Sequence, residues 1–216
     1  MSKVNIKYEI QFHTDWHCGS GLAAGAGVDA LTVKDKNGLP FIPGKTIKGL
    51  VREAVEEILF IGGKGEMAND KRDLFKQTFG NSKDRNIIKE GQQPKDENEK
   101  ADSYKETHKG ETFFTNAMLK EDEVNAIIEN NAVRFMYRTV ANTAIDETGI
   151  AVENSLRKTE VAVPCKCYGE ILDVPVAFEK EICDALKYIK RLGQGRNRGL
   201  GRCTIEITEV EKGGEK

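Results

Sequence analysis

The order of the apolar patterns at the two ends of the chain constrains the fold more than any other feature. Strict alternation predicts a half-buried N-terminal strand, with apolar residues at Val4, Ile6, Tyr8, Ile10 and Phe12. A helix follows from Pro43-Gly44, because apolar residues there recur at intervals of three and four. Toward the C-terminus, strand character over 168–178 precedes a helix over 179–192 and a closing strand over 203–210.

Strand–helix followed by strand–helix–strand is the order of a ferredoxin-like or RNA-recognition-motif-like sheet, and we predict an α+β fold with this core. The middle of the chain is predicted to contribute further helices and strands. Apolar spacing predicts a short helix over 70–79, a strand near 113–118, a helix over 121–131 that buries Val124, Ile127 and Ile128, and a strand over 133–137.

Two large insertions are predicted within a single domain spanning residues 1–216. Residues 81–110 are nearly all polar or charged and cannot bury enough apolar surface to fold alone, so a polar insertion is placed at about 62–112. A weakly alternating stretch rich in β-branched residues predicts an arm or hairpin at about 138–164. No internal repeat is present, which disfavours a solenoid.

Composition favours a cytoplasmic protein without a membrane partner. No apolar run approaches the ~20 residues that a bilayer-spanning helix needs, and the N-terminus lacks the features of a signal peptide. Five cysteines without a compact framework suit a reducing compartment. The formal net charge of −2 shows no general excess of basic residues, so any polyanion site depends on local clustering.

The segment from Gly19 to Arg52 has the features of an anion site. A glycine-rich loop leads to Asp29, a turn around Asn37-Gly38 follows, and the helix then begins with Thr46 as a candidate cap. Lys45, Lys48 and Arg52 lie off the apolar stripe near the helix start, where cations oppose the dipole by ~0.3–1 kcal/mol each. Such a departure from local preference indicates function, although an ordinary solvated helix face is the alternative.

A second basic cluster lies near the C-terminus, in and before the sequence GQGRNRGLGR. No acidic residue interrupts its six cations, which are Lys187, Lys190, Arg191, Arg196, Arg198 and Arg202. Glycine and arginine together in a loop suit contact with phosphate, since arginine pairs with it through two parallel hydrogen bonds. The alternative is that the glycines only form a tight turn.

The spacing of the remaining motifs disfavours several other chemistries. Neither glycine-rich loop has the strand–helix context of a dinucleotide site or the pattern of a phosphate loop, so no nucleotide cofactor is expected. Cys165 and Cys167 lack the spacing of a structural zinc site, and no metal-ligating set is assigned. Asp29 is a lone carboxylate that can act as a base toward a ribose hydroxyl or help to hold a divalent cation. Its alternative role is a loop cap.

These motifs together resemble the RAMP superfamily of CRISPR-associated proteins. The glycine loop that ends in Asp29 is followed by DKNGLPFIPGKTIKGLVR at 35–52, and LGQGRNRGLGR precedes the last strand. The segment VANTAIDETGIAVENSLRKTEVAVP is similar to the thumb hairpin of the repeating backbone subunit of type III effector complexes.

The resemblance implies a guide-RNA-binding backbone subunit that cleaves target RNA at regular intervals. Implied partners are the CRISPR guide RNA, the target RNA, copies of the same subunit along the guide and other type III effector subunits. Asp29 is the implied catalytic residue, with a divalent cation such as Mg²⁺ or Mn²⁺ as cofactor. The implied guide-binding residues are Lys45, Thr46, Lys48, Arg52, Gly195, Arg196, Arg198, Gly199, Gly201 and Arg202.

Two alternatives remain open from the sequence. One is a structural subunit that coats RNA without cutting it, because a single carboxylate is a thin catalytic signal. The other is a ribonuclease that processes guide precursors and uses His13 or His17 as acid and base.

Overall fold

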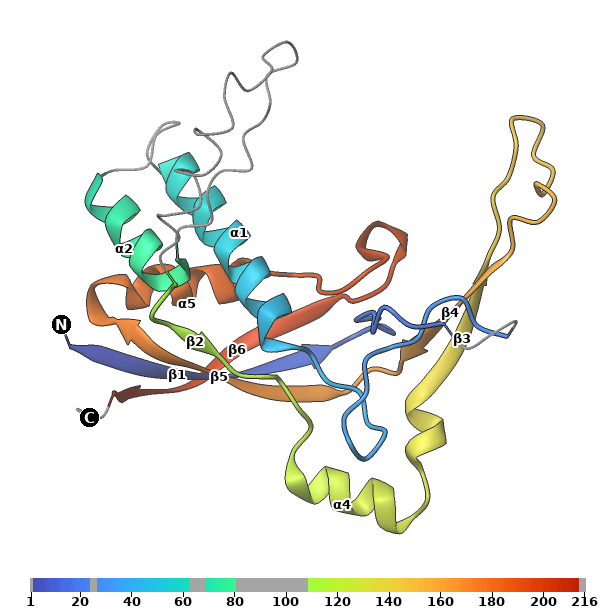
Figure 1. Ribbon diagram of the computed structural model, residues 1–216, viewed down its shortest axis with the longest axis horizontal. Helices are drawn as coiled ribbons and strands as arrows, with labels where there is room; N and C mark the ends of the chain where they lie inside the picture. Colours follow the sequence, from blue (N-terminus) through green and yellow to red (C-terminus); the bar gives the residue numbers. More distant parts are fainter. Residues whose placement is uncertain (1, 24–26, 63–68, 81–108, 214–216) are drawn as a thin grey trace, which may run out of the picture.

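A four-stranded antiparallel sheet forms the centre of the computed structural model, which describes residues 2–23, 27–62, 69–80 and 109–213. Its strands follow the spatial order β2-β5-β1-β6, with bounds β1 Lys3–Phe12, β2 Phe113–Phe114, β5 Lys166–Pro175 and β6 Cys203–Lys212 (Figure 1). A helix follows β1 and another follows β5, as in the βαββαβ ferredoxin-like order. The predicted α+β class and core are confirmed.

The central strand β1 is the strand that the sequence predicts. Its residues alternate between buried and half-buried along the whole length, because both neighbouring strands hold it in register. Tyr8 lies opposite Gly169 of β5, and a Cβ atom on Gly169 would overlap the Tyr8 ring. Glycine is therefore required there for the two strands to pair over a buried tyrosine.

Three helices cover one face of the sheet: α1 Gly44–Gly62, α2 Asn69–Phe79 and α5 Glu179–Tyr188 (Figure 1). The apolar stripe of α1 packs into the core through Ile47, Val51, Ala54 and Val55. Phe79 of α2 stacks on Phe114 of β2 with 5.9 Å between ring centroids. The predicted helix over 179–192 ends earlier, at Tyr188, although Ile189 and Leu192 remain buried. None of the described helices is long and apolar enough to span a membrane.

The start of α1 differs from the prediction that Thr46 caps it. The helix begins at Gly44, whose N–H donates to Asn116 Oδ1 at 2.9 Å. A side chain far away in the sequence therefore performs the capping. A Cβ atom on Gly44 would overlap the carbonyl oxygen of Phe114, so glycine lets the helix start press against β2.

The opposite face of the sheet is polar and paired. Lys7 forms ion pairs with Glu209 at 2.9 Å and Glu211 at 2.8 Å, and Lys166 pairs with Glu9 at 3.0 Å. These pairs hold the pKa of Lys7 above its usual value. The face that RNA-recognition motifs use for stacking bases is occupied here by salt bridges.

Two predictions for the region after β2 are wrong. Residues 133–137 were expected to form a strand, but Val133–Met136 forms a short 3₁₀ helix, η1. Helix α4, Glu121–Glu129, was expected to bury its apolar residues and buries none, with Ile128 42% exposed. The helix lies apart from the sheet (Figure 1), and Val124 and Ile127 are only half-buried.

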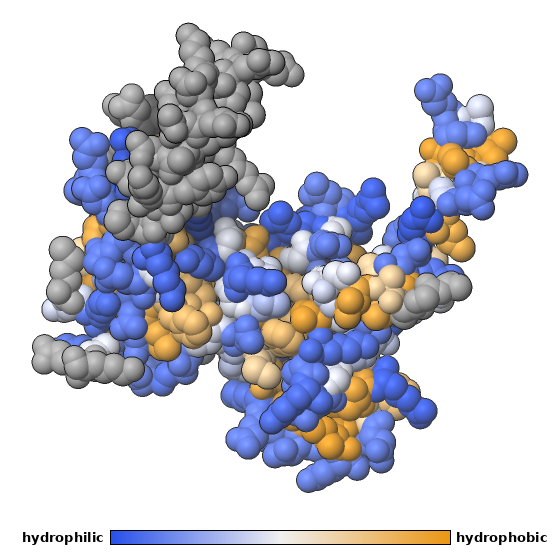
Figure 2. Space-filling model, viewed as in Figure 1, coloured by the Kyte–Doolittle hydropathy of each residue, from blue (hydrophilic) through white to orange (hydrophobic). Residues whose placement is uncertain are grey.

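The predicted arm at 138–164 is a β-hairpin. Strands β3 Tyr137–Asn142 and β4 Arg157–Ala162 pair with each other and project from the sheet (Figure 1). We call this hairpin the thumb. Figure 2 shows apolar surface at its outer end, where Ile145, Ile150, Val152 and Leu156 are exposed. The polar insertion at 62–112 lies largely outside the described residues, and the single domain over 1–216 stays a prediction.

Two glycines of α1 give substitutions with opposite expected effects on stability. Gly44→Ala forces the helix start away from β2, so we expect the free energy of unfolding to fall by about 1–3 kcal/mol. A Cβ atom on Gly49 would meet nothing within 4 Å outside its own helix backbone, so Gly49→Ala should raise the free energy of unfolding by about 0.5–1 kcal/mol through helix propensity. Urea denaturation of both variants measures the difference, and equal effects would contradict the packing described here.

Candidate nucleic-acid interface

The glycine-rich loop at 193–202 is held in one shape by its backbone. Gly193 and Gly201 both have positive φ, and a Cβ atom on either would overlap a carbonyl oxygen, of His17 and Leu192 respectively. Gln194 N–H donates to His17 O, and Gly201 N–H donates to the carbonyl of Asp15, both at 2.8 Å. Gly193 and Gly201 are therefore needed for the tight turn. Gly199 also has positive φ, but a Cβ atom there would meet nothing within 4 Å.

The arginines of this loop face solvent. Arg196–Arg198 forms a single 3₁₀ turn, η3, between the left-handed glycines Gly195 and Gly199. The guanidinium of Arg191 donates to the Arg196 carbonyl, which fixes it beside the loop. Within the described residues, no carboxylate pairs with Arg191, Arg196, Arg198 or Arg202. The loop is thus a stiff, uncompensated positive surface.

The cations of α1 lie beside a different group of residues. Lys48 lines a groove of about 500 Å³ together with Lys109 and the segment that leads into β2. The pKa of Lys48 is lowered mainly by burial, and also by the positive charges of Arg52 and Lys109. Three cations therefore lie close together at this groove. The Arg52 guanidinium lies over the Phe75 ring at 5.5 Å, and Lys45 is exposed near the helix start.

Helix geometry separates these cations from the glycine-rich loop. Residues four apart share a helix flank, which places Lys48 with Arg52. Leu50, Glu53 and Glu57 lie on the other flank and line a second groove with Arg191 and Arg196. The spacing puts Thr46 on that second flank, since it precedes Leu50 by four. The residues predicted to bind guide RNA therefore form two groups, one on each side of α1.

Asp29 lies at the root of the thumb. The chain at 29–30 runs along the edge of β4, where Ala30 pairs with Thr159 in a parallel bridge. Asp29 N–H donates to the Lys158 carbonyl at 2.8 Å, and Lys158 N–H donates to Asp29 Oδ2 at 2.7 Å. Asp29 is exposed, and its Oδ1 has no hydrogen-bond partner among the described residues.

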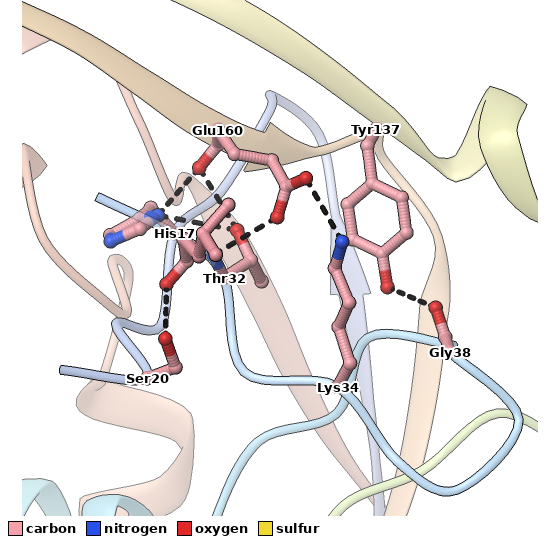
Figure 3. A network of polar contacts seen from close by, with 8 residues as sticks. His17, Ser20, Thr32, Lys34, Gly38, Tyr137 and Glu160 are labelled. Atoms are coloured by element: carbon pink, nitrogen blue, oxygen red, sulfur yellow. Dashed lines mark hydrogen bonds and ion pairs between the residues drawn. The ribbon is translucent and has the colours of Figure 1, made fainter. Parts of the chain in front are cut away.

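A polar network fixes the thumb root next to Asp29 (Figure 3). Glu160 of β4 accepts from Thr32 N–H at 3.1 Å and pairs with Lys34 at 3.0 Å. Tyr137 of β3 donates to the Gly38 carbonyl at 2.6 Å, and Lys34 Nζ lies 4.1 Å from the centre of its ring. Burial is the main cause that raises the pKa of Tyr137. Both thumb strands are thereby tied to the segment that carries Asp29.

The two histidines do not face a shared reaction site. His17 is buried, and its Nδ1 lies 2.6 Å from the Glu160 carbonyl, which can only accept, so Nδ1 carries the proton. His17 Nε2 is buried without a partner in the described part of the chain. His13 Nε2 lies 2.8 Å from the Thr204 hydroxyl at the end of β6. His17 is therefore shielded from a bound RNA, whereas His13 is exposed.

Metal-ligating side chains are dispersed. Across the described ranges no group of three or more His, Cys, Asp or Glu residues could hold an ion. Cys165 immediately precedes β5 and Cys167 lies within it, and all five cysteines are buried or half-buried free thiols. Burial raises the pKa of Cys18 to about 12. Asp29 offers a divalent cation one free carboxylate oxygen.

Sequence reasoning missed several residues of this interface. Lys109 follows a long polar stretch and carries no motif, yet chain pairing places it beside Lys48. Glu160 and Tyr137 read as ordinary strand residues, although they fix the thumb root. Their partners are distant in the sequence, so no local pattern indicates these roles.

Comparison with known proteins matches the RAMP superfamily over residues 9–204. The chain is 25% identical, over 95% of its length and 88% of the relative's, to the CRISPR system Cms endoribonuclease Csm3 of Streptococcus thermophilus. Two type III-B Cmr-beta cryo-EM structures contain similar chains. One, bound to cognate target RNA, has a TM-score of 0.59 at 11% identity, covering 94% of this chain and 96% of that one. The other, in the apo state, has a TM-score of 0.57 at 12% identity, covering 95% and 97%.

Replacement of Asp29 should show what its carboxylate does for the thumb. Asp29→Ala removes the acceptor of the Lys158 N–H, so we expect that amide to exchange hydrogen about five to ten times faster. Asp29→Asn keeps an acceptor oxygen and should leave exchange nearly unchanged. Hydrogen exchange read by NMR measures both. Equal protection in the two variants would show that the hydrogen bond does not hold the thumb.

Proposed function

The chain belongs to the RAMP superfamily, and on this basis we propose that it is the guide-RNA-binding backbone subunit of a type III CRISPR effector complex and cleaves the target RNA. The observation that carries the proposal is the position of Asp29, exposed at the root of a projecting thumb. Supporting it are a relative named as an endoribonuclease, matched over nearly the whole chain, and the fold shared with chains of Cmr-beta.

The guide RNA would bind along both flanks of α1. The glycine-rich loop presents Arg196, Arg198 and Arg202, whose guanidinium groups pair with no carboxylate of the described residues. Arginine suits phosphate because its planar fork donates two parallel hydrogen bonds. Lys45, Lys48 and Arg52 supply positive charge on the far side of the helix. Copies of the subunit along one guide, with other type III effector subunits, complete the proposed complex.

Cleavage would take place where the thumb meets the target strand. The exposed apolar side chains of the outer part of the thumb, Ile145, Ile150, Val152 and Leu156, suit insertion between bases. Asp29 lies where the paired strands of the hairpin end, bonded to Lys158, two residues from Leu156. Asp29 Oδ1 would accept the proton of a ribose 2′-hydroxyl as its oxygen bonds to the neighbouring phosphorus. The bond from that phosphorus to the 5′-oxygen then breaks, leaving a cyclic phosphate and, after proton uptake from water, a 5′-hydroxyl. Positioning of the nucleotide supplies the remaining acceleration.

A divalent cation fits this site only with help from RNA. Mg²⁺ in nucleic-acid sites is commonly held by one or two carboxylates together with phosphate oxygens, and Asp29 can supply one such ligand. When bound, the ion would stabilise negative charge on the phosphate. The hydrogen bond from Lys158 N–H holds the carboxylate in place and leaves Oδ1 either to contact the ion or to accept the proton of the 2′-hydroxyl, and these are alternative roles of the one oxygen.

A non-catalytic coating subunit is the second candidate, and one observation favours it. Asp29 Oδ2 already caps the edge of β4, so the carboxylate has a structural role without any reaction. The guide-processing alternative lacks such support, because His17 is buried and His13 bonds to Thr204.

Asp29→Asn in the assembled complex separates the two candidates. It keeps the acceptor for Lys158 but cannot take a proton, so cleavage at regular intervals should slow by about 10²–10⁴-fold with target binding nearly unchanged. Cleavage by the wild type should also stop on chelation of divalent cations and resume with Mg²⁺. Sequencing gels of labelled target RNA give both results. Wild-type rates in the Asn variant would leave only the coating role.

RNA binding should depend on salt in proportion to the phosphates contacted. For a single strand, log affinity falls against log salt with a slope of ~−0.7 per phosphate. Lys48→Ala or Arg198→Ala should flatten the slope by about that amount, whatever the RNA sequence. Lys180→Ala removes the same charge at the opposite end of α5 and should not change it. A flat dependence in the wild type would contradict the proposed interface.

A further inference from the structure

Two cysteines lie at the joint between the thumb and the sheet. Strand β4 of the thumb ends at Ala162 and β5 of the sheet begins at Lys166, so only residues 163–165 connect them. Cys165 is the last residue of this joint, and Cys167 is the second residue of β5. Neither belongs to the residues proposed to bind or cleave RNA. A chemical change at these two residues would therefore act on the thumb without altering the RNA-binding side chains.

The two thiols, which we call the thiol pair, are in contact. Cys167 donates a hydrogen bond to the Cys165 sulfur, and the indole N–H of Trp16 donates to the same sulfur. The backbone fixes both positions, because Phe12 N–H donates to the Cys165 carbonyl at 3.0 Å and Cys167 lies opposite Ile10 of β1. The two sulfurs are therefore held next to each other before any reaction.

Cys165 differs from the other cysteines in its tendency to ionise. The hydrogen bond from Cys167 is the main cause that lowers the pKa of Cys165, and the one from Trp16 adds to it. Burial and the nearby carboxylate of Glu123 oppose this shift in the pKa but are outweighed. The same hydrogen bond raises the pKa of Cys167. Burial raises the pKa of the three remaining thiols, which are Cys18, Cys183 and Cys203.

Cys165 is also within reach of small molecules. It is half-buried and follows the exposed Pro164, whereas Cys167 is fully buried. Reactive cysteines combine thiolate character with partial exposure, and buried structural cysteines are inert. Cys165 is therefore suited to react first, with Cys167 beside it as the second thiol. Cys183 is half-buried too but lacks the lowered pKa, which makes it a matched control.

We propose that the thiol pair is a redox-sensitive site, which a hydroperoxide converts to a disulfide that loosens the root of the thumb. The Cys165 thiolate attacks one oxygen of hydrogen peroxide, the O–O bond breaks, and the hydroxide released takes a proton from solvent, leaving a sulfenic acid. The Cys167 sulfur then attacks the Cys165 sulfur. The S–S bond forms and the S–O bond breaks, and the departing hydroxide leaves as water with the Cys167 proton. The two thiols lose two electrons, which the peroxide gains.

The disulfide would disturb hydrogen bonds that hold the thumb root. An S–S bond is shorter than a contact between two thiols, so positions 165 and 167 have to approach each other. The Cys165 carbonyl accepts from Phe12 N–H, and Val163 N–H in the same joint donates to the Met136 carbonyl at 2.9 Å. Both bonds should weaken on oxidation. In the reducing compartment that the composition favours, such a disulfide would be transient, as redox-sensing disulfides are.

Thiol labelling of the full chain tests the reactivity of Cys165. With limiting iodoacetamide at pH 7.5, Cys165 should be alkylated about tenfold faster than Cys183, as measured by mass spectrometry of tryptic peptides. Cys167→Ala removes the hydrogen bond, so the ratio should fall to near one. Equal rates in the wild type would overturn the proposal, and so would a ratio that survives in the variant.

Peroxide treatment tests the pairing. Trypsin cleaves after Lys166, so a disulfide between Cys165 and Cys167 joins two peptides that otherwise separate, and dithiothreitol should release them. Cys167→Ser should stop at the sulfenic acid, which dimedone labels, and Cys183→Ser should form the disulfide as the wild type does. A disulfide from Cys165 to any other cysteine, or between two chains, would contradict the assignment.

Hydrogen exchange tests the effect on the thumb. The amides of Phe12 and Val163 should exchange about five to ten times faster in the oxidised wild type, and Cys167→Ser treated in the same way should show no such change. Unchanged exchange in the disulfide form would overturn the loosening of the thumb root. None of these measurements uses RNA, so their failure leaves the function proposed above untouched.

Discussion

The buried His17 is the point at which three separated parts of the chain meet. Its ring donates to the Glu160 carbonyl in the thumb, and its own carbonyl accepts from Gln194 in the glycine-rich loop. The same carbonyl leaves no space for a side chain on Gly193. Neighbouring Asp15 repeats the arrangement, because it pairs with Arg138 of the thumb at 3.4 Å and accepts from Gly201. The thumb and the basic loop therefore share one anchor.

This anchor explains why a lone carboxylate can be well placed without other acids around it. Asp29 is exposed, but the segment that carries it pairs with β4, and β4 is fixed through Glu160 and Tyr137. A side chain held by such a backbone does not have to be ordered again when RNA binds, which is the benefit of preorganisation. The structural role of Asp29 and its proposed catalytic role thus depend on the same hydrogen bond with Lys158.

The core could be predicted from the sequence because the patterns that specify its strands and helices are local. The alternation in β1 and the apolar stripe of α1 are each contained within one element, and most apolar residues of both patterns are buried in the structure. The predictions that failed depended on distant partners: Asn116 instead of Thr46 satisfies the start of α1, and α4 lies apart from the sheet and buries none of its residues. For the interface, the sequence identified which cations to consider. It could not show that α1 separates Lys48 from the glycine-rich loop, since that follows from how the helix packs.

The distribution of charge shows where an RNA can bind on a protein whose net charge is negative. The open face of the sheet pairs its lysines with glutamates, so an RNA there would have to displace existing ion pairs and approach the remaining acids. The glycine-rich loop instead carries arginines without carboxylate partners among the described residues. A phosphate gains most where positive charge is not already neutralised. The fold is therefore of the RNA-recognition-motif type, but the charge distribution favours the proposed RNA-binding surface beside the helices over one on the sheet.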